Sequence, residues 1–353
     1  MTKTSYWTVE ELKNRLQSLP RVSLAPLPTP LEPLPRLSEE WQIRLFVKRD
    51  DLTGLAFGGN KVRHLEFSLA QALKEGCDVV INGAAIQSNY CRQTAAACAR
   101  LGLRCALVLR QDPRVEPLKT EPQGNFLLDQ ILNADVRLIS IDQDLEEAKE
   151  AVAQEYRSMG HKPFVLRHPI SNVTGGFGYL VCLLEILEQS AQMGFFPDYI
   201  FVSSCTATQS GLIVGVKALG LPVKVIGVNP SHRMAPCHSH LAQVSNLVAD
   251  ALQLNLTFTE EDVINTDDFI GDGYGIPSPA GNRALLEVAR KEGLLLDPIY
   301  TAKAMAALFH MVLTGEVPKG SRVVFIHTGG LPALFAYQPS LIAALAPSAA
   351  LDR

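Results

Sequence analysis

The sequence predicts an α/β protein with two open, twisted, mostly parallel sheets flanked by helices. Short apolar runs rich in β-branched residues alternate with longer segments whose apolar residues recur at the helical period. That alternation is typical of βαβ units, in which helices cover parallel strands. The apolar runs fall into two groups, residues 79–166 and 199–327, and 353 residues can supply a core for each. We therefore expect two α/β domains with a ligand-binding cleft between them.

The expected elements follow in chain order. Strands are predicted at residues 45–48, 79–81, 105–109, 136–138, 164–166, 199–202, 224–228 and 322–327. Helical spacing is found at residues 61–74, 92–101, 175–193 and 301–313. The proline-rich segment 26–35 is expected to form an extended arm, and the Ala- and Pro-rich residues after Tyr337 are expected to form a tail.

Composition and charge narrow the class of function. The formal net charge is −4 and the basic residues are scattered, so neither nucleic acid nor an anionic membrane is expected as a partner. The longest charge-free stretch, residues 199–216, is interrupted by Ser, Thr, Gln and Gly and is too polar for a membrane span, and the N-terminus lacks the apolar core of a signal peptide. The seven cysteines form no C-x-x-C pair, which favours buried free thiols in a reducing, cytoplasmic compartment.

The first candidate for chemistry is a loop that ends in a lysine. Residues 58–61, Gly-Gly-Asn-Lys, follow the charged segment 48–51, Lys-Arg-Asp-Asp. The glycines allow a tight turn, and Asn60 can cap a helix that begins near Lys61. A lysine at the mouth of a cleft can lose its proton near neutral pH and form a Schiff base. The same residues also suit an ordinary loop followed by a helix with a surface lysine.

Two further segments place small residues between a predicted strand and a helix. Residues 82–90, which include Ser88 and Asn89, follow one strand, and residues 203–211 follow another. Such turns present free backbone N–H groups, which suit a carboxylate near Ser88 and Asn89 and a phosphate in the second segment. Ordinary N-capping explains the same residues, and neither segment matches a nucleotide-binding motif.

Turn residues flank Tyr274 and Tyr300 toward the C-terminus, and His327 ends an apolar strand. Tyrosines in such places can act as acid–base groups if their pKa values are lowered, although packing tyrosines are commoner. His327 is expected to be a hydrogen-bonded histidine rather than a ligand. No His, Cys, Asp and Glu residues cluster with metal-ligand spacing, and no serine nucleophile elbow occurs, so no metal is expected.

Taken in order, these segments resemble the family of D-cysteine desulfhydrase and 1-aminocyclopropane-1-carboxylate deaminase over residues 24–337. The matching segments are residues 28–32, 48–51, 58–61, 85–89, 273–275, 296–301, 325–330 and 333–337. The resemblance implies the tryptophan synthase β-like fold of the fold type II enzymes, with pyridoxal 5′-phosphate as cofactor. It also implies a large cofactor-binding domain, residues 1–60 with 169–353, and a small domain, residues 61–168, that carries Lys61.

The resemblance implies roles for the matching positions. Lys61 would bind the cofactor covalently, and Ser88, Tyr274 and Tyr300 would complete the catalytic set. The substrate would meet Gln87, Ser88, Asn89 and Tyr90, of which Ser88 and Asn89 would hold its carboxylate. Residues 205–211 would form the cup for the cofactor phosphate. The expected cofactor contacts besides Lys61 are Asn60, Asn89, Cys205, Thr206, Ala207, Thr208, Gln209, Thr301 and Thr328.

The implied reaction removes the α-proton of a small amino acid and expels a group from its β-carbon, giving pyruvate and ammonia. Thr301 and Thr328 stand where family deaminases carry Glu and Leu, as in the desulfhydrase branch. A hydroxyl favours a protonated pyridine nitrogen much less than a carboxylate does. The sequence therefore favours elimination of a good leaving group such as thiolate, with sulfide as product.

Three departures from the family leave alternatives open. Tyr90 stands where relatives have His or Gln, and Ser204 and Ala207 replace glycines of the phosphate loop. Residues 167–170 precede Ser171 where relatives have a glycine pair, and they suit either a surface loop or contact with an extra anionic group. The alternatives are a 1-aminocyclopropane-1-carboxylate deaminase, a β-lyase or β-replacement enzyme with an unusual substrate, and a cofactor-binding protein without turnover. A homodimer is usual for the family and is expected.

Overall fold

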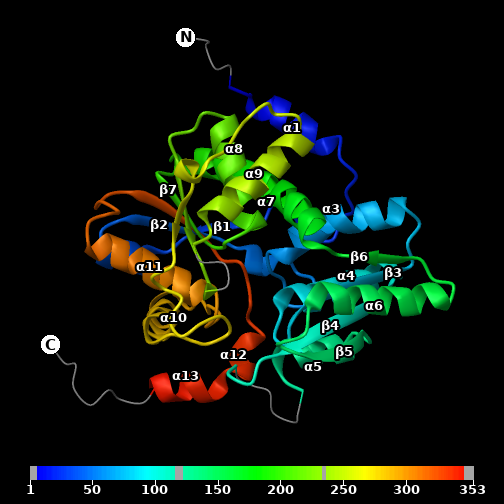
Figure 1. The fold of residues 1–353 in the computed structure, drawn as a ribbon. Helices are drawn as coiled ribbons and strands as arrows, with labels where there is room; N and C mark the ends of the chain where they lie inside the picture. The colour runs from blue at the N-terminus through cyan, green and yellow to red at the C-terminus, as the bar shows by residue number, and fades with distance from the viewer. Residues whose placement is uncertain (1–5, 116–121, 233–235, 346–353) are drawn as a thin grey trace.

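The computed structural model describes residues 6–115, 122–232 and 236–345, and it contains two separate sheets. The six-stranded sheet has the order β1-β2-β10-β7-β8-β9, and the four-stranded sheet has the order β5-β4-β3-β6. Figure 1 shows the larger sheet and its helices on one side of the molecule and the smaller sheet with α3 to α6 on the other. The predicted fold class is confirmed.

Parallel pairing dominates both sheets, as expected for strands joined through helices. In the larger sheet only β1 (Leu31–Pro33) runs antiparallel, and it pairs with β2. The other strands are β2 (Arg44–Lys48), β10 (Arg322–Ile326), β7 (Tyr199–Ser203), β8 (Lys224–Val228) and β9 (Ile264–Thr266). The smaller sheet comprises β5 (Asp135–Ser140), β4 (Arg104–Gln111), β3 (Val79–Ala85) and β6 (Pro163–Val165).

Helices cover both faces of each sheet. One face of the larger sheet packs against the helices α1 (Val9–Gln17), α7 (His168–Gln192), α8 (Ala207–Ala218) and α9 (His238–Ala251). The opposite face packs against α2 (Pro35–Trp41), α10 (Pro279–Glu292) and α11 (Thr301–Leu313). The smaller sheet lies between the pair α3 (Lys61–Lys74) and α4 (Asn89–Leu101) and the single helix α6 (Leu145–Ser158). The remaining helices are α5 (Gly124–Ile131), α12 (Ala333–Ala336) and α13 (Gln338–Leu345).

All eight predicted strands are present, with bounds shifted by a few residues, but both terminal predictions were partly wrong. The proline-rich arm contains β1 and the start of α2, because Pro35 has no N–H to lose at the first turn of a helix. The predicted tail after Tyr337 begins with α13. Strand β9 was not predicted, since three residues with two polar members give no apolar run.

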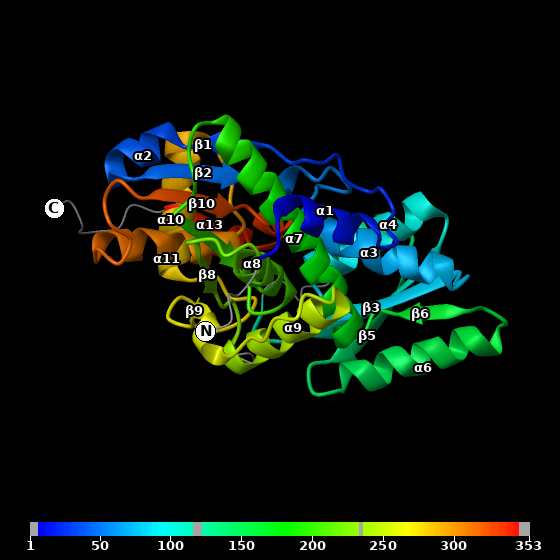
Figure 2. The same cartoon turned by 90° about the horizontal axis from the view of Figure 1, so that it is seen from above.

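The long helix α7 lies between the two sheets (Figure 2). Residues 170–192 are apolar and long enough to cross a bilayer by composition, yet 72% of their most apolar window is buried inside the protein. A helix that is apolar on most sides is also what the centre of a large soluble protein requires. Its burial against α3, α8 and α9 accounts for its composition.

A buried ion-pair network fastens α3 to the larger sheet. Arg63 on α3 donates to Asp50 and to Glu185 on α7, each at 2.8 Å, and Lys48 at the end of β2 lies 2.7 Å from Glu185. Arg63, Asp50 and Lys48 are almost completely buried, so each charge depends on its partners. Removing one partner of such a buried group typically costs about 3–5 kcal/mol. The network therefore fixes the helix that begins with Lys61.

Candidate active site

Lys61 is the first residue of α3, so its side chain starts at the N-terminal end of that helix. Its Nζ makes no hydrogen bond or ion pair with any residue that the structure describes, and it lies 5.6 Å from the centroid of the Tyr90 ring. Burial lowers the pKa of Lys61 to about 8. A sizeable fraction of the amine is therefore neutral near physiological pH, and the neutral form is the one that attacks a carbonyl carbon.

The loop before Lys61 has a backbone that only glycine can adopt without strain. Gly58 and Gly59 have φ angles of +63° and +127°. A Cβ atom on Gly58 would lie 2.0 Å from the carbonyl oxygen of Asp51, and one on Gly329 would lie 2.7 Å from Cα of Gly59. The glycines thus let the loop after β10 approach the lysine loop closely.

The predicted cap of α3 was wrong. Asn60 has helical backbone angles and makes no side-chain cap; its Nδ2 instead donates to the hydroxyl of Thr208 at 3.2 Å. The backbone N–H of Asn60 donates to the carbonyl oxygen of Thr328 at 3.0 Å. Gln93 on α4 accepts from the N–H of Val62 at 2.9 Å and so satisfies the helix start from outside. Local sequence could not reveal a partner that lies on another helix.

Ser88 and Gln87 both use their side chains to hold the loop that follows β3. Ser88 is the N-cap of α4, and its hydroxyl accepts from the N–H groups of Tyr90 and Cys91 at 3.1 and 3.2 Å. The amide of Gln87 accepts from the N–H of Asn125 at 2.9 Å and donates to a carbonyl oxygen just before it. The capping alternative therefore holds for Ser88, whose hydroxyl still has a proton to donate.

A turn of small residues leads from β7 into α8. The hydroxyl of Ser204 accepts from the N–H groups of Thr206 and Gln209, each at 3.2 Å. The side chain of Gln209 is buried and points to β9, where it donates to the carbonyl oxygen of Ile264 and accepts from Asn265, each at 2.7 Å. Only the backbone of Gln209 thus belongs to the turn.

Cys205, Ala207 and Thr208 complete this turn, at the positively polarised end of α8. Burial raises the pKa of the Cys205 thiol to about 12, so the thiol is neutral. The hydroxyl of Thr208 accepts from Asn60 and lies 3.3 Å from Nε2 of His64. Burial holds the pKa of His64 well below its usual range, so its ring is neutral as well. The turn therefore carries backbone and hydroxyl donors but no fixed negative charge.

Tyr274 and Tyr300, predicted separately, meet with their hydroxyl oxygens 2.5 Å apart. Lys303 donates to the carbonyl oxygens of Ile270 and Gly273 and so fixes the turn before Tyr274. The lowered pKa that the acid–base hypothesis required is absent. Burial raises the pKa of both phenols, and the neighbouring phenol raises that of Tyr300 further. Both phenols are therefore protonated at neutral pH; because one donates to the other, one proton of the pair remains free to be donated outward.

The two threonines of interest differ in their surroundings. The hydroxyl of Thr301 is buried and donates to Asp297 at 2.6 Å, whereas that of Thr328 makes no hydrogen bond with the residues that the structure describes. His327 lies 2.8 Å from the carbonyl oxygen of Leu295 through Nε2, and its Nδ1 accepts a backbone N–H. The prediction of a hydrogen-bonded rather than ligating His327 is confirmed.

Tyr90 stands beside the lysine. Its hydroxyl lies 3.2 Å from Oγ of Ser171 on α7, and burial raises its pKa to about 12. Arg167, just before α7, is exposed and forms an ion pair with Glu150 on α6. That pair agrees with a surface position for Arg167, but the predicted loop was wrong, because residues 168–170 form the first turn of α7. Tyr90, one of the three departures from the family, thus contacts Ser171, the residue that follows the departure at residues 167–170.

The sequence analysis missed two residues that contact Asn89. Arg92, completely buried on α4, donates to the Oδ1 atom of Asn89 at 3.2 Å, and Asn125 on α5 donates to the same atom at 3.0 Å. Arg92 lies only three residues after Asn89, on the helix that follows the site loop. An arginine so close to a predicted site residue could have been included among the candidates, since arginines are rarely buried without a role. No local signal marks Asn125, which lies 36 positions from Asn89.

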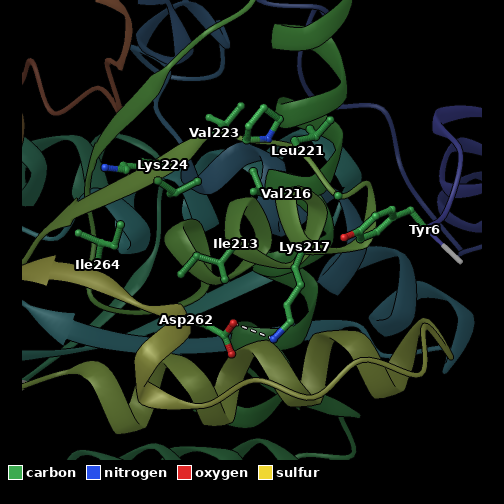
Figure 3. Close-up of a pocket in the computed structure, with 12 residues that line it drawn as sticks. Tyr6, Ile213, Val216, Lys217, Leu221, Val223, Lys224, Asp262 and Ile264 are labelled. Carbon is green, nitrogen blue, oxygen red and sulfur yellow. Dashed lines mark hydrogen bonds and ion pairs between the residues drawn. The ribbon is translucent and has the colours of Figure 1, made fainter. Parts of the chain in front are cut away.

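A separate cavity of about 380 Å³ lies between α8 and the strands β8 and β9, of which β9 is at the edge of the sheet (Figure 3). Its lining includes Tyr6, Ile213 and Lys217, and Lys217 is paired with Asp262 at 2.7 Å. None of the predicted site residues lines it. The chemistry suggested by the sequence therefore belongs to the loops between the two sheets.

Those loops fit pyridoxal phosphate. Parallel strands β2, β3, β7 and β10 end at the loops described above, so the carboxyl ends of both sheets supply them. Among the described residues the amine of Lys61 has no hydrogen-bond or ion-pair partner that would compete with an aldehyde. The turn before α8 contains no acidic side chain, although the carboxylate of Asp267 lies close enough to raise the pKa of Cys205. Fold and site together define a pyridoxal phosphate-dependent enzyme of fold type II.

Comparison with known proteins agrees. Residues 22–329 match the family described as pyridoxal-phosphate dependent enzyme, and the chain belongs to that family. D-cysteine desulfhydrases of Salmonella choleraesuis (strain SC-B67) and Klebsiella pneumoniae are each 38% identical to it over 326 residues, which cover 92% of this chain and 98% of theirs. An ACC deaminase homologue of known structure has a TM-score of 0.85 at 33% identity, covering 95% of this chain and 99% of its own.

Proposed function

We propose that this enzyme catalyses α,β-elimination from a small amino acid, as a D-cysteine desulfhydrase does, and releases pyruvate, ammonia and sulfide. The observation that carries the proposal is the unpartnered amine of Lys61 beside the N-terminus of α4, in a chain 38% identical to D-cysteine desulfhydrases. When bound, pyridoxal phosphate supplies the electron sink for the α-carbon. The protein supplies orientation, charge and proton transfer.

Each group of residues has a distinct task in this proposal. Lys61 holds the cofactor and, once the substrate amine has replaced it, takes the α-proton on Nζ, which a pKa of about 8 permits. Ser88 and Asn89 donate to the substrate carboxylate. The backbone N–H groups of residues 205–209 and the hydroxyl of Thr208 bind the phosphate. Tyr274 and Tyr300 are both protonated, and the phenol whose proton is not used in their mutual hydrogen bond donates to the departing group.

The threonines support elimination over ring opening. We assign Thr328 to the pyridine nitrogen, because the hydroxyl of Thr301 is already held by Asp297 at 2.6 Å. A hydroxyl does not hold a proton on that nitrogen as a carboxylate would, so the electron sink is weaker. A thiolate leaves with a weak sink, whereas a carbon leaving group requires a strong one.

One alternative has direct support. The solved structure with a TM-score of 0.85 belongs to an ACC deaminase homologue, and cyclopropane ring opening starts from the same cofactor. Thr301 and Thr328 argue against it for the reason just given. An enzyme with an unusual β-substituent, or one that adds a nucleophile instead of releasing the product, uses the same residues. A binding protein without turnover has no use for the paired phenols of Tyr274 and Tyr300.

The test is a product assay with purified enzyme and added pyridoxal phosphate. D-cysteine, L-cysteine and 1-aminocyclopropane-1-carboxylate are compared by release of sulfide, pyruvate, 2-oxobutyrate and ammonia. We expect sulfide and pyruvate from cysteine, and Lys61→Ala should lose both turnover and the visible absorption of the bound cofactor. Lys74→Ala, at the exposed end of the same helix, is the matched control. Turnover of the cyclopropane alone would establish the deaminase, and no product from any substrate would refute catalysis.

We further propose that residues 1–60 with 169–353 and residues 61–168 act as the large and small domains, that the enzyme is cytoplasmic, and that it is a homodimer. Each sheet has its own hydrophobic clusters, which supports the division. All seven cysteines are free and buried, which suits a reducing compartment. The proposed homodimer is based on the family resemblance. Sedimentation equilibrium of the holoenzyme measures its mass, which should be twice the chain mass of 38.5 kDa.

A further inference from the structure

Arg92 is a buried cation whose described hydrogen bonds all go to neutral oxygens. Its Nη1 donates to the side-chain oxygens of Asn89 and Asn125 at 3.2 and 2.8 Å, and its Nη2 donates to the carbonyl oxygen of Gly58 at 2.6 Å. Its side chain is completely buried, and no carboxylate among the described residues forms an ion pair with it. Burial accordingly lowers its pKa to about 10, with Asp129 opposing that shift. Such a group destabilises the fold unless its hydrogen bonds serve a purpose.

A guanidinium group donates only, so it determines which end of a neighbouring amide faces it. The Oδ1 atom of Asn89 faces Arg92, and so does that of Asn125. Asn125 then directs its Nδ2 to the carbonyl oxygen of Gln87 at 2.7 Å and to Oδ1 of Asn89 at 3.0 Å. The oxygen of Asn89 therefore has two donors, and its Nδ2 has no acceptor among the described residues.

The same arginine links the two loops of the site. Gly58 belongs to the loop that carries Lys61, and Asn89 belongs to the loop at the start of α4. The next residue, Gln93, accepts from the backbone N–H that follows Lys61. One buried turn of α4 thus contacts both the lysine loop and the amide of Asn89.

We propose that Arg92 is a positioning residue that keeps the Nδ2 of Asn89 turned toward the substrate carboxylate. The inference rests on the proposed function and deepens it, since it explains which end of Asn89 is offered to the substrate. With Arg92 absent, Oδ1 of Asn89 keeps only the neutral donor Nδ2 of Asn125, at 3.0 Å, so the preference for turning Nδ2 of Asn89 toward the substrate weakens. Arg92 itself touches neither substrate nor cofactor.

The experiment compares alanine with alaninamide, two ligands that differ only in the carboxylate and have no β-substituent to lose. D- and L-forms are titrated into the holoenzyme, and binding is followed by the change in visible absorption. For Arg92→Met we expect alanine to bind about tenfold more weakly or worse, the usual loss for a hydrogen bond to a charged group, and alaninamide to bind within about twofold of wild type. Arg100→Met, on the same helix, is the matched control and should change neither.

A double-mutant cycle separates positioning from general damage. In an Asn89→Ala background, Arg92→Met should weaken alanine binding by less than about twofold, because its effect passes through Asn89. Arg92→Lys should restore part of the affinity, since an ammonium group also donates only. Equal losses for alanine and alaninamide, or an unchanged loss in the Asn89→Ala background, would overturn the inference.

Arg92→Gln keeps the inference testable if Arg92→Met does not fold. A glutamine amide can either donate or accept, so it no longer selects the oxygen of Asn89. Alanine should lose about tenfold in affinity and alaninamide should not, with folding checked by the melting temperature. Retained alanine affinity in folded Arg92→Gln enzyme refutes positioning. A wild type that binds neither cofactor nor alanine refutes the proposed function instead, so the two failures differ.

Discussion

Ser204→Ala should make the enzyme bind pyridoxal phosphate more tightly. In this structure the Ser204 hydroxyl accepts from the N–H groups of Thr206 and Gln209, each at 3.2 Å, at the turn proposed to bind the phosphate. A phosphate that uses these donors must first displace the hydroxyl. One neutral hydrogen bond is worth about 0.5–1.5 kcal/mol net. Because Gln209 also donates to the carbonyl oxygen of Thr206 at 3.1 Å, we count about one full bond.

The expected gain is therefore about 1 kcal/mol, or roughly fivefold in the dissociation constant. Apoenzyme is titrated with pyridoxal phosphate, and free cofactor is measured after rapid dialysis, so that the result does not depend on turnover. Ser245→Ala, at a buried serine on α9 outside the phosphate turn, is the matched control. Weaker binding in Ser204→Ala would show that the hydroxyl binds the phosphate, and equal binding would show that it does not compete; either outcome refutes the reasoning.

Three further results are expected. The rate at which apoenzyme binds the cofactor covalently should rise with pH, and the midpoint of this rise should lie near pH 8. Burial lowers the pKa of Lys61 to about 8, and only the neutral amine reacts. A rate that continues to rise past pH 9 would contradict this. Tyr274→Phe or Tyr300→Phe should lower kcat about 10²–10³-fold. Neither variant should change the pH dependence of kcat between pH 6 and 9, because burial raises the pKa of both phenols. A loss of only twofold would exclude a catalytic role. Burial raises the pKa of Asp129 to about 8. Between about pH 4 and 8 the carboxyl group is therefore protonated in the folded state and ionised in the unfolded state. The free energy of unfolding falls as the pH rises through that range. Asp129→Asn should therefore raise the melting temperature at pH 8 by about 5 °C more than at pH 5, and equal shifts at both pH values would argue against this assignment.

Local sequence predicts the parts of this fold that local physics determines. Strands β7 and β8 are continuous apolar runs because helices bury both faces, and the sequence locates both. Strands β1 and β9 have three residues each and depend on pairing with a neighbouring strand, so they leave no pattern. The same holds for α13, whose residues after Tyr337 resemble a tail until α10 and α12 pack against them.

Some residues of the candidate site could likewise be predicted from local sequence, and others could not. Motifs locate Lys61 and the loop at Ser88, because glycines and small residues are needed at specific backbone positions. The contact between Tyr274 and Tyr300, 26 positions apart, arises only from tertiary packing. The direction of their pKa shifts was also beyond prediction, because burial of a side chain depends on the whole fold.

The buried cysteines of this enzyme can be used to measure local opening of the structure. A thiol reagent in solution can modify a buried cysteine only after the surrounding structure separates, so each modification rate measures a local opening free energy. Cys205 lies in the turn before α8, whereas Cys77, Cys98 and Cys105 lie in the hydrophobic cluster of the smaller sheet. Protection of Cys205 relative to the others, with and without cofactor, would therefore distinguish tightening of one loop from stabilisation of the entire fold.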